Sequence, residues 1–92
     1  MPDFNQTFYL TTDLSNIAIG AILEQEIEGY LHPIAYASRK LSKSEQDYST
    51  TWKEALACVY EVNYFKYYLM GRKFVLITDH KPLQYLMTMK KD

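Results

Sequence analysis

The feature that most constrains the fold is a change in hydrophobic spacing near residue 42. Before that point, apolar and polar residues alternate in three short segments, and a period of two is typical of strands with one buried face. Residues 14–16 and the Glu28-Gly29 pair have the composition of tight turns. We therefore predict three strands joined by two hairpins, at about residues 7–13, 17–25 and 34–39.

The second of these segments carries two small residues on the face opposite its apolar side chains. Ile17, Ile19 and Ala21 lie on one face, and Ala18 and Gly20 lie on the other. A glycine inside a strand often marks a place where another group approaches the backbone closely. We expect such a close approach at this face of the second strand.

After residue 42 the spacing becomes helical. Ser42 or Ser44 can cap a short first turn, and Ser49 or Thr50 can cap a longer helix, so we predict helical structure over about residues 43–70. Gly71 is a typical residue to follow the end of a helix. An apolar stripe along the helix is predicted to lie on the sheet, and it consists of Ala55, Val59, Val62, Phe65 and Leu69.

The last third of the sequence predicts one more strand and one more helix. Residues 73–79 are mostly apolar, as in a central strand, and Pro82 suits the first turn of a helix over about residues 82–89. A helical crossover returns the fourth strand parallel to the third, and so parallel to the first. We predict an α/β domain over residues 1–92, with a mixed sheet in the order 3-2-1-4.

Composition excludes several classes of protein. The net charge is −1, which does not indicate a strong stand-alone nucleic-acid binder, and the single cysteine, Cys58, cannot form an internal disulfide. One cysteine and two histidines are too few for a structural zinc site. No apolar run is long enough to span a bilayer, and the N-terminus does not resemble a signal peptide. We expect a soluble intracellular protein that contacts no membrane.

Three carboxylates are placed where they can converge. Asp13 and Asp79 end the first and fourth strands, which are predicted to be parallel neighbours, and Glu54 lies near the start of the long helix. Three such groups in one crevice need a cation, and oxygen ligands favour Mg²⁺ or Mn²⁺. Each acid also has a simpler interpretation, because Asp13 can form a turn, the helix dipole favours an acid at Glu54, and Asp79 can cap the last helix.

Several ordered motifs resemble one family. The sequence FYLTTDLS at residues 8–15 is followed by AIGAIL at 18–23, HPIAYASRKL at 32–41, KEALA at 53–57 and TDHKPL at 78–83. Together they are similar to the ribonuclease H domain of the reverse transcriptase in gypsy-type LTR retrotransposon Pol polyproteins. The similarity extends over almost the whole chain, and Pro2-Asp3-Phe4 resembles the segment that joins the reverse transcriptase to this domain.

The resemblance implies an endonuclease that cuts the RNA strand of RNA/DNA hybrids with two Mg²⁺ or Mn²⁺ ions. By position, Asp13, Glu54 and Asp79 match three catalytic, metal-binding carboxylates of the family. The implied partners are the hybrid and the adjacent reverse transcriptase and integrase domains, and the implied location is the cytoplasm, in a retroelement particle, or the nucleus. Residues expected to contact nucleic acid on the same basis are Ser15, Ser38, Arg39, Tyr48 and His80.

The sequence also departs from the family's pattern. The family has a fifth strand, a last helix and a fourth catalytic aspartate beyond the position of Asp92, so we expect the domain to be incomplete at its C-terminus. Leu14 replaces a small residue, and Trp52 stands where the family often has an acid. The alternative hypothesis is a catalytically silent module that serves as a tether or as a domesticated host protein. Retention of all three assignable carboxylates favours the enzyme.

Overall fold

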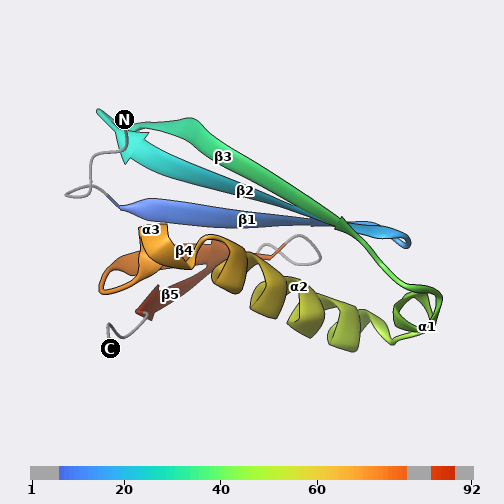
Figure 1. Cartoon of the computed structure of the whole chain (residues 1–92). Coiled ribbons are helices and arrows are strands. Elements are labelled where there is room, and N and C mark those ends of the chain that lie inside the picture. The colour runs from blue at the N-terminus through green and yellow to red at the C-terminus, as the bar shows by residue number, and fades with distance from the viewer. Residues whose placement is uncertain (1–6, 79–83, 89–92) are drawn as a thin grey trace.

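The computed structural model describes residues 7–78 and 84–88 of the chain. These residues form a single sheet of five strands and three helices (Figure 1). The strands are β1 Phe8–Leu14, β2 Ala18–Ile27, β3 Tyr30–Lys40, β4 Lys73–Ile77 and β5 Gln84–Thr88, and the helices are α1 Lys43–Gln46, α2 Thr50–Tyr64 and α3 Lys66–Leu69.

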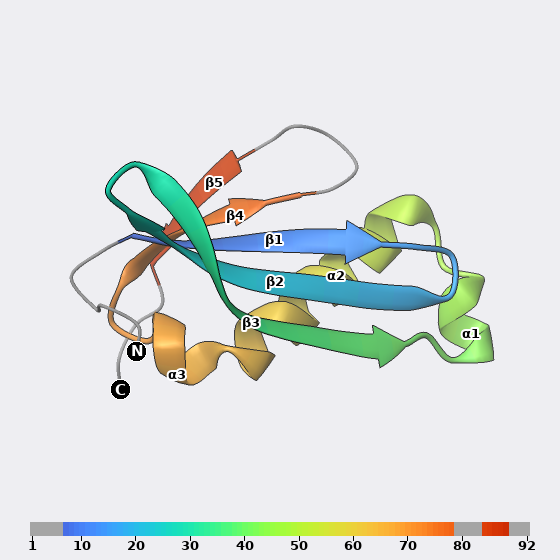
Figure 2. The ribbon, with the colours of Figure 1, turned by 90° about the horizontal axis from the view of Figure 1, so that it is seen from above.

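The strand order is β3-β2-β1-β4-β5. β1 pairs antiparallel with β2 and parallel with β4, and β2 pairs antiparallel with β3. The predicted order 3-2-1-4 is therefore confirmed, and the helical segment is the crossover that makes β4 parallel to β1 (Figure 2). β1 lies in the middle of the sheet and pairs with β2 as far as Leu14, but with β4 only as far as Thr11.

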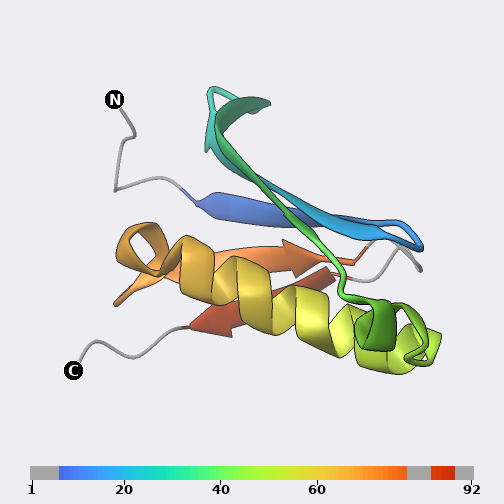
Figure 3. The same ribbon diagram turned by 45° about the vertical axis from the view of Figure 1, so that its right-hand side comes forward.

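The β2–β3 hairpin is longer than the sequence predicts. Glu28 and Gly29 have φ values of 53° and 85°, and two successive residues with positive φ make the turn that matches strand twist. The pairing contains an irregularity at Leu23/Glu24, where Glu24 is opposite Pro33. A proline is tolerated there because β3 is an edge strand and needs no donor at that position. Figure 3 shows the hairpin rising away from α2 toward its turn.

Two serine caps divide the predicted helix at its start. Ser42 accepts from the backbone N–H of Glu45, whose side chain accepts in turn from the Ser42 backbone N–H, so α1 begins with a capping box. Ser49 caps α2 in the same way by accepting from Trp52 N–H. The helical stretch ends in α3, after a change of backbone conformation at Phe65 (φ −101°, ψ 18°).

The helices cover one face of the sheet, and the core lies between the two layers (Figures 1 and 3). Along β1, the buried residues alternate with half-buried or exposed ones on the other face. No helix in the described part of the chain is long and apolar enough to cross a membrane. The buried apolar residues are Phe8, Leu10, Ile19, Ala21, Leu23, Ala37, Leu41, Ala57, Phe65, Leu69, Phe74 and Leu76.

The predicted apolar stripe of α2 is wrong in its first half. Ala55 is exposed and 60% of Val59 is accessible, whereas the buried residues of α2 are Ala57 and Glu61. The predicted stripe is displaced from the buried face of the helix because the prediction counts hydrophobic residues, whereas the buried face carries an acid. The second half of the stripe is confirmed, since Phe65 and Leu69 are buried.

Residues 84–88 form a strand where the sequence predicts a helix over residues 82–89. β5 pairs antiparallel with β4 from Lys73↔Thr88 to Ile77↔Gln84. A short apolar segment fits either structure by periodicity alone, so its partner decides. Pairing with β5 satisfies the backbone groups of β4 that would otherwise form an open edge. The rest of the predicted helix lies outside the described residues.

Candidate active site

Asp13 lies near the exposed end of β1. Its backbone pairs with Gly20 of β2, and its side chain alternates with that of Thr12. Thr12 is buried toward α2, so Asp13 is on the opposite, uncovered face of the sheet. The carboxylate is therefore open to a ligand from solvent.

Gly20, beside Asp13, leaves room for groups that approach its backbone closely. A Cβ atom built on Gly20 would lie 3.1 Å from the Tyr36 hydroxyl oxygen and 3.3 Å from the Asp13 carbonyl oxygen. The close approach expected at this glycine is confirmed, and the approaching group is a tyrosine of β3. Tyr36 is largely exposed, so its hydroxyl group lies on the same open face as Asp13.

Glu54 approaches the same end of the sheet from the helix. It lies in the second turn of α2, and its Oε1 atom is buried with no hydrogen-bond partner in the described part of the chain. A buried carboxylate oxygen without a donor is costly, because its desolvation is not compensated. Such an atom suits a cation, which would supply the missing interaction.

A hollow of about 430 Å³ lies between the end of β1 and the start of α2. It is lined by the residues that directly follow Asp13 and by one that directly precedes Glu54. Leu14 also packs against the small core cluster that includes Ala57 of α2. The two elements that carry the predicted acids thus meet at one end of the molecule (Figure 2). The lining residues are Leu14, Ser15, Asn16, Thr50 and Lys53.

Two predicted site residues, Asp79 and His80, lie outside the described residues. Within residues 7–78 and 84–88, no three His, Cys, Asp or Glu side chains are grouped so that they could hold a metal ion. The described portion thus contains two of the three predicted ligands. Their chemistry fits a hard divalent cation, since both are carboxylates and one has a buried oxygen without a partner.

Comparison with known proteins identifies the family. The family described as "RNase H-like domain found in reverse transcriptase" matches residues 3–92. The chain belongs to this family. The resemblance seen in the sequence is therefore confirmed, and the fold described above is that of an RNase H-like domain.

Three similar proteins are polyproteins of transposons. The chain is 45% identical over 91 residues to the retrovirus-related Pol polyprotein from transposon 297 of Drosophila melanogaster, covering 99% of this chain and 8% of that protein. It is 42% identical over 85 residues to the Pol polyprotein from transposon gypsy of the same organism, covering 91% and 8%. It is 36% identical over 84 residues to the transposon Tf2-3 polyprotein of Schizosaccharomyces pombe, covering 88% and 6%. The chain therefore spans less than a tenth of the length of these relatives.

The residues predicted to contact nucleic acid are spread over this RNase H-like domain. Ser15 forms the β1–β2 turn, where its Oγ accepts from the backbone N–H groups of Ile17 and Ala18. Ser38 is exposed on β3, and its carbonyl oxygen accepts from the Tyr60 hydroxyl at 3.0 Å. Ser15 therefore lies at the hollow beside Asp13, while Ser38 lies on the neighbouring edge strand.

Arg39 is held by an acid. Its guanidinium donates to both carboxylate oxygens of Glu45, at 2.9 and 2.8 Å. This contact lowers the pKa of Glu45 to about 2 and raises the pKa of Arg39. Arg39 thus bonds α1 to the end of β3, and a phosphate would have to compete with Glu45 for it.

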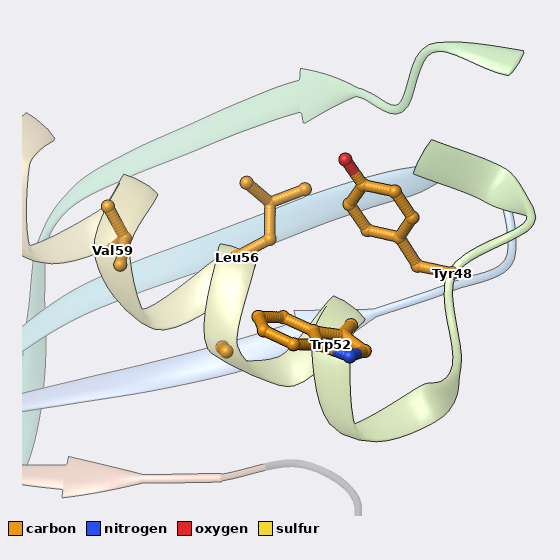
Figure 4. A pocket seen from close by; sticks show the side chains of 5 residues that line it. Tyr48, Trp52, Leu56 and Val59 are labelled. Carbon is orange, nitrogen blue, oxygen red and sulfur yellow. The ribbon is translucent and has the colours of Figure 1, made fainter. Parts of the chain in front are cut away.

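Tyr48 lines an apolar hollow of about 540 Å³ on the outside of α2 (Figure 4). Tyr48 comes from the link between α1 and α2, and the other lining side chains come from α2 itself. Trp52 is 68% exposed there, so it does not pack into the core. This side of α2 faces away from the sheet because the opposite side, which carries an acid, faces the sheet. The other lining residues are Ala55, Leu56 and Val59.

Glu61 is the residue that the sequence analysis missed. It is completely buried, and the Thr12 hydroxyl oxygen lies 2.7 Å from each of its carboxylate oxygens. Burial raises the pKa of Glu61 to about 7, although the Thr12 hydrogen bond opposes the change. The available signal was its spacing, since Glu61 follows Glu54 by two helical turns, between the buried Ala57 and Phe65.

Removing the unpaired oxygen of Glu54 should stabilise the metal-free protein. Replacing Glu54 with Met removes an uncompensated buried acceptor, and we expect a gain of about 1–3 kcal/mol in unfolding free energy. Thermal unfolding in EDTA measures this, and Thr51→Met on the exposed side of α2 is the control for helix propensity. An unchanged or lower melting temperature for Glu54→Met would contradict the interpretation that Glu54 has an unpaired, buried oxygen that destabilises the metal-free protein.

Proposed function

We propose that this RNase H-like domain hydrolyses the RNA strand of RNA/DNA hybrids as part of a retrotransposon reverse transcriptase polyprotein. The observation that carries the proposal is the buried oxygen of Glu54, which has no partner in the described residues and belongs to the helix whose start shares a hollow with the end of β1. The proposed metal ligands and catalytic residues are Asp13, Glu54 and Asp79. Family membership supports the proposal, because RNase H-type domains use carboxylates for this reaction.

The proposed mechanism uses the position of each carboxylate. Two bound Mg²⁺ or Mn²⁺ ions would supply activation of a water molecule and stabilisation of the leaving 3′ oxygen. Asp13, exposed on the uncovered face, would hold the ions where the scissile phosphate arrives. Glu54 would bind with the oxygen that has no protein donor. Asp79 would complete the set from the segment that follows β4.

The substrate would bind over the uncovered face of the sheet. Recognition of RNA would rest on 2′-hydroxyl groups in the minor groove of the hybrid, because shape and sugar contacts distinguish such duplexes. The net charge of −1 supports a role for neighbouring domains in holding the nucleic acid. We propose contacts from Ser15, Ser38, Arg39, Tyr48 and His80.

The relatives support a proposal for the partners and the location. The similar proteins are Pol polyproteins of transposons, and the chain covers only a small part of each. We therefore propose that the domain works beside reverse transcriptase and integrase domains. Its proposed location is the cytoplasm, in a retroelement particle, with the nucleus as the alternative.

Cleavage of labelled duplexes tests the proposal. The chain, extended with any sequence that follows Asp92 in its gene, is incubated with RNA/DNA, RNA/RNA and DNA/DNA duplexes of one sequence in Mn²⁺ or Mg²⁺. We expect cleavage of the RNA strand in the hybrid alone, and its complete loss in EDTA. Binding without cleavage in either metal would support the catalytically silent module instead.

A further inference from the structure

The buried contact between Thr12 and Glu61 has chemistry that a packing contact does not need. Glu61 has 0% of its surface accessible, and both of its carboxylate oxygens lie 2.7 Å from the Thr12 hydroxyl oxygen. A hydroxyl group has one hydrogen to donate, so the two oxygens of an ionised carboxylate would have to share it. The second short contact is satisfied when the carboxyl group is protonated and donates to Thr12.

The surroundings of Glu61 favour this neutral form. The face of β1 and β4 toward α2 is otherwise apolar, with Leu10 and Leu76 beside Thr12. The Cys58 thiol is a titratable group near Glu61 on the same helix, and its pKa is raised by burial and by the charges of Glu61 and Glu54. Cys58 brings no positive charge to Glu61. A neutral, doubly hydrogen-bonded carboxyl group is therefore the favoured arrangement below about pH 7.

The contact also links the two elements of the candidate site. Thr12 directly precedes Asp13 on β1, and Glu61 shares α2 with Glu54, about 10 Å along the helix axis. We propose that Glu61 is a positioning residue, whose contact with Thr12 holds the end of β1, and so Asp13, at a fixed place relative to Glu54. This inference rests on the proposed function for the role of the two acids.

A directional contact is suited to this task. Apolar packing is non-directional and tolerates small sliding of a helix over a sheet, whereas two short hydrogen bonds specify one register. Replacing both partners by apolar groups of similar shape can leave stability nearly unchanged. Stability and positioning can therefore be separated by experiment.

The test compares a double variant with the wild type. Thr12→Val with Glu61→Met removes both polar groups and keeps their approximate shape, while Glu61→Gln keeps a side chain that can both donate and accept. Amide hydrogen exchange at residues 12–14, relative to that of Phe8, reports the order of the β1 end without any activity. Cleavage of the hybrid gives kcat and KM, and urea unfolding gives stability.

We expect the double variant to unfold at a similar urea concentration. Its exchange protection at residues 12–14 and its kcat should each fall about tenfold with KM unchanged, and Glu61→Gln should restore both. Equal protection and equal kcat in the double variant and wild type would overturn the inference. If the wild type does not cleave, the proposed function fails, and the exchange comparison still decides whether Glu61 positions β1.

A second pair of variants tests the inference if the double variant does not fold. Thr12→Ser keeps the hydroxyl group and removes a methyl group, whereas Thr12→Val keeps the shape and removes the hydroxyl group. We expect Thr12→Ser to keep the exchange protection of residues 13 and 14 and Thr12→Val to lose it. The opposite order would show that the methyl group, and hence packing, holds the strand end.

Discussion

Asp13→Asn should lower kcat for hybrid cleavage on the order of a thousandfold, since single catalytic carboxylates contribute effects of this size or larger. The substitution keeps the shape of the side chain and removes its charge. Asp13 is exposed, and its side chain lies away from the core, so the variant should fold as the wild type does. The measurement is single-turnover cleavage of a labelled RNA/DNA hybrid in Mn²⁺ by the extended protein.

A matched control is Asp47→Asn. Asp47 is also an exposed aspartate, but it lies at the C-cap of α1 and in no part of the candidate site. Its variant should cleave within about twofold of the wild type, because exposed substitutions away from such features have small effects. Equal rates for the Asp13 variant and the wild type would show that Asp13 is not a metal ligand.

The free energy of unfolding should fall by about 3 kcal/mol as the pH rises from 4.5 to about 7, because in this range the folded protein keeps a Glu61 proton that the unfolded chain has released. The pKa of Glu61 is about 7 in the folded protein and 4.5 in the unfolded chain, so the folded state binds the extra proton between these values. The stabilisation is full below pH 4.5 and is lost as the pH passes through 7. Urea unfolding at a series of pH values measures it.

Glu61→Gln isolates this effect, because the amide does not titrate. The curve for the variant should lack the fall between pH 4.5 and 7, while contributions of other acids remain in both proteins. Glu45 has a lowered pKa of about 2, so its contribution changes at lower pH and with the opposite sign. Parallel curves for wild type and Glu61→Gln would mean that Glu61 ionises normally. The folded protein would then not retain a proton on Glu61 above pH 4.5.

Local patterns were sufficient for much of this fold. Alternation predicted β1, β2 and β3, and the positive φ values at Glu28 and Gly29 match the predicted turn. Ser42 and Ser49 cap α1 and α2 as expected, because a cap needs only a side-chain oxygen two or three residues before a free N–H. Chain connectivity then led to the order of the first four strands.

The candidate site was predictable in part. Asp13 lies where the strand pattern placed it, and Glu54 lies at the same end of the sheet. The unpaired oxygen of Glu54 was not predictable, because it depends on which groups from other elements surround that atom. A close approach at Gly20 was expected, but the sequence did not show that Tyr36 makes it, since this approach joins side chain and backbone across neighbouring strands.

The sequence by itself determined that the first four strands exist, where α1 and α2 are capped, which family the chain resembles, and which acids stand at the ends of the elements. Those properties depend on neighbours along the chain. Only the tertiary structure decided that residues 84–88 pair with β4, that α2 turns an acid toward the sheet, and that Thr12 receives it. Burial and pairing are set by groups distant in sequence, so the environment of Glu61 exists only after the helix packs on the sheet.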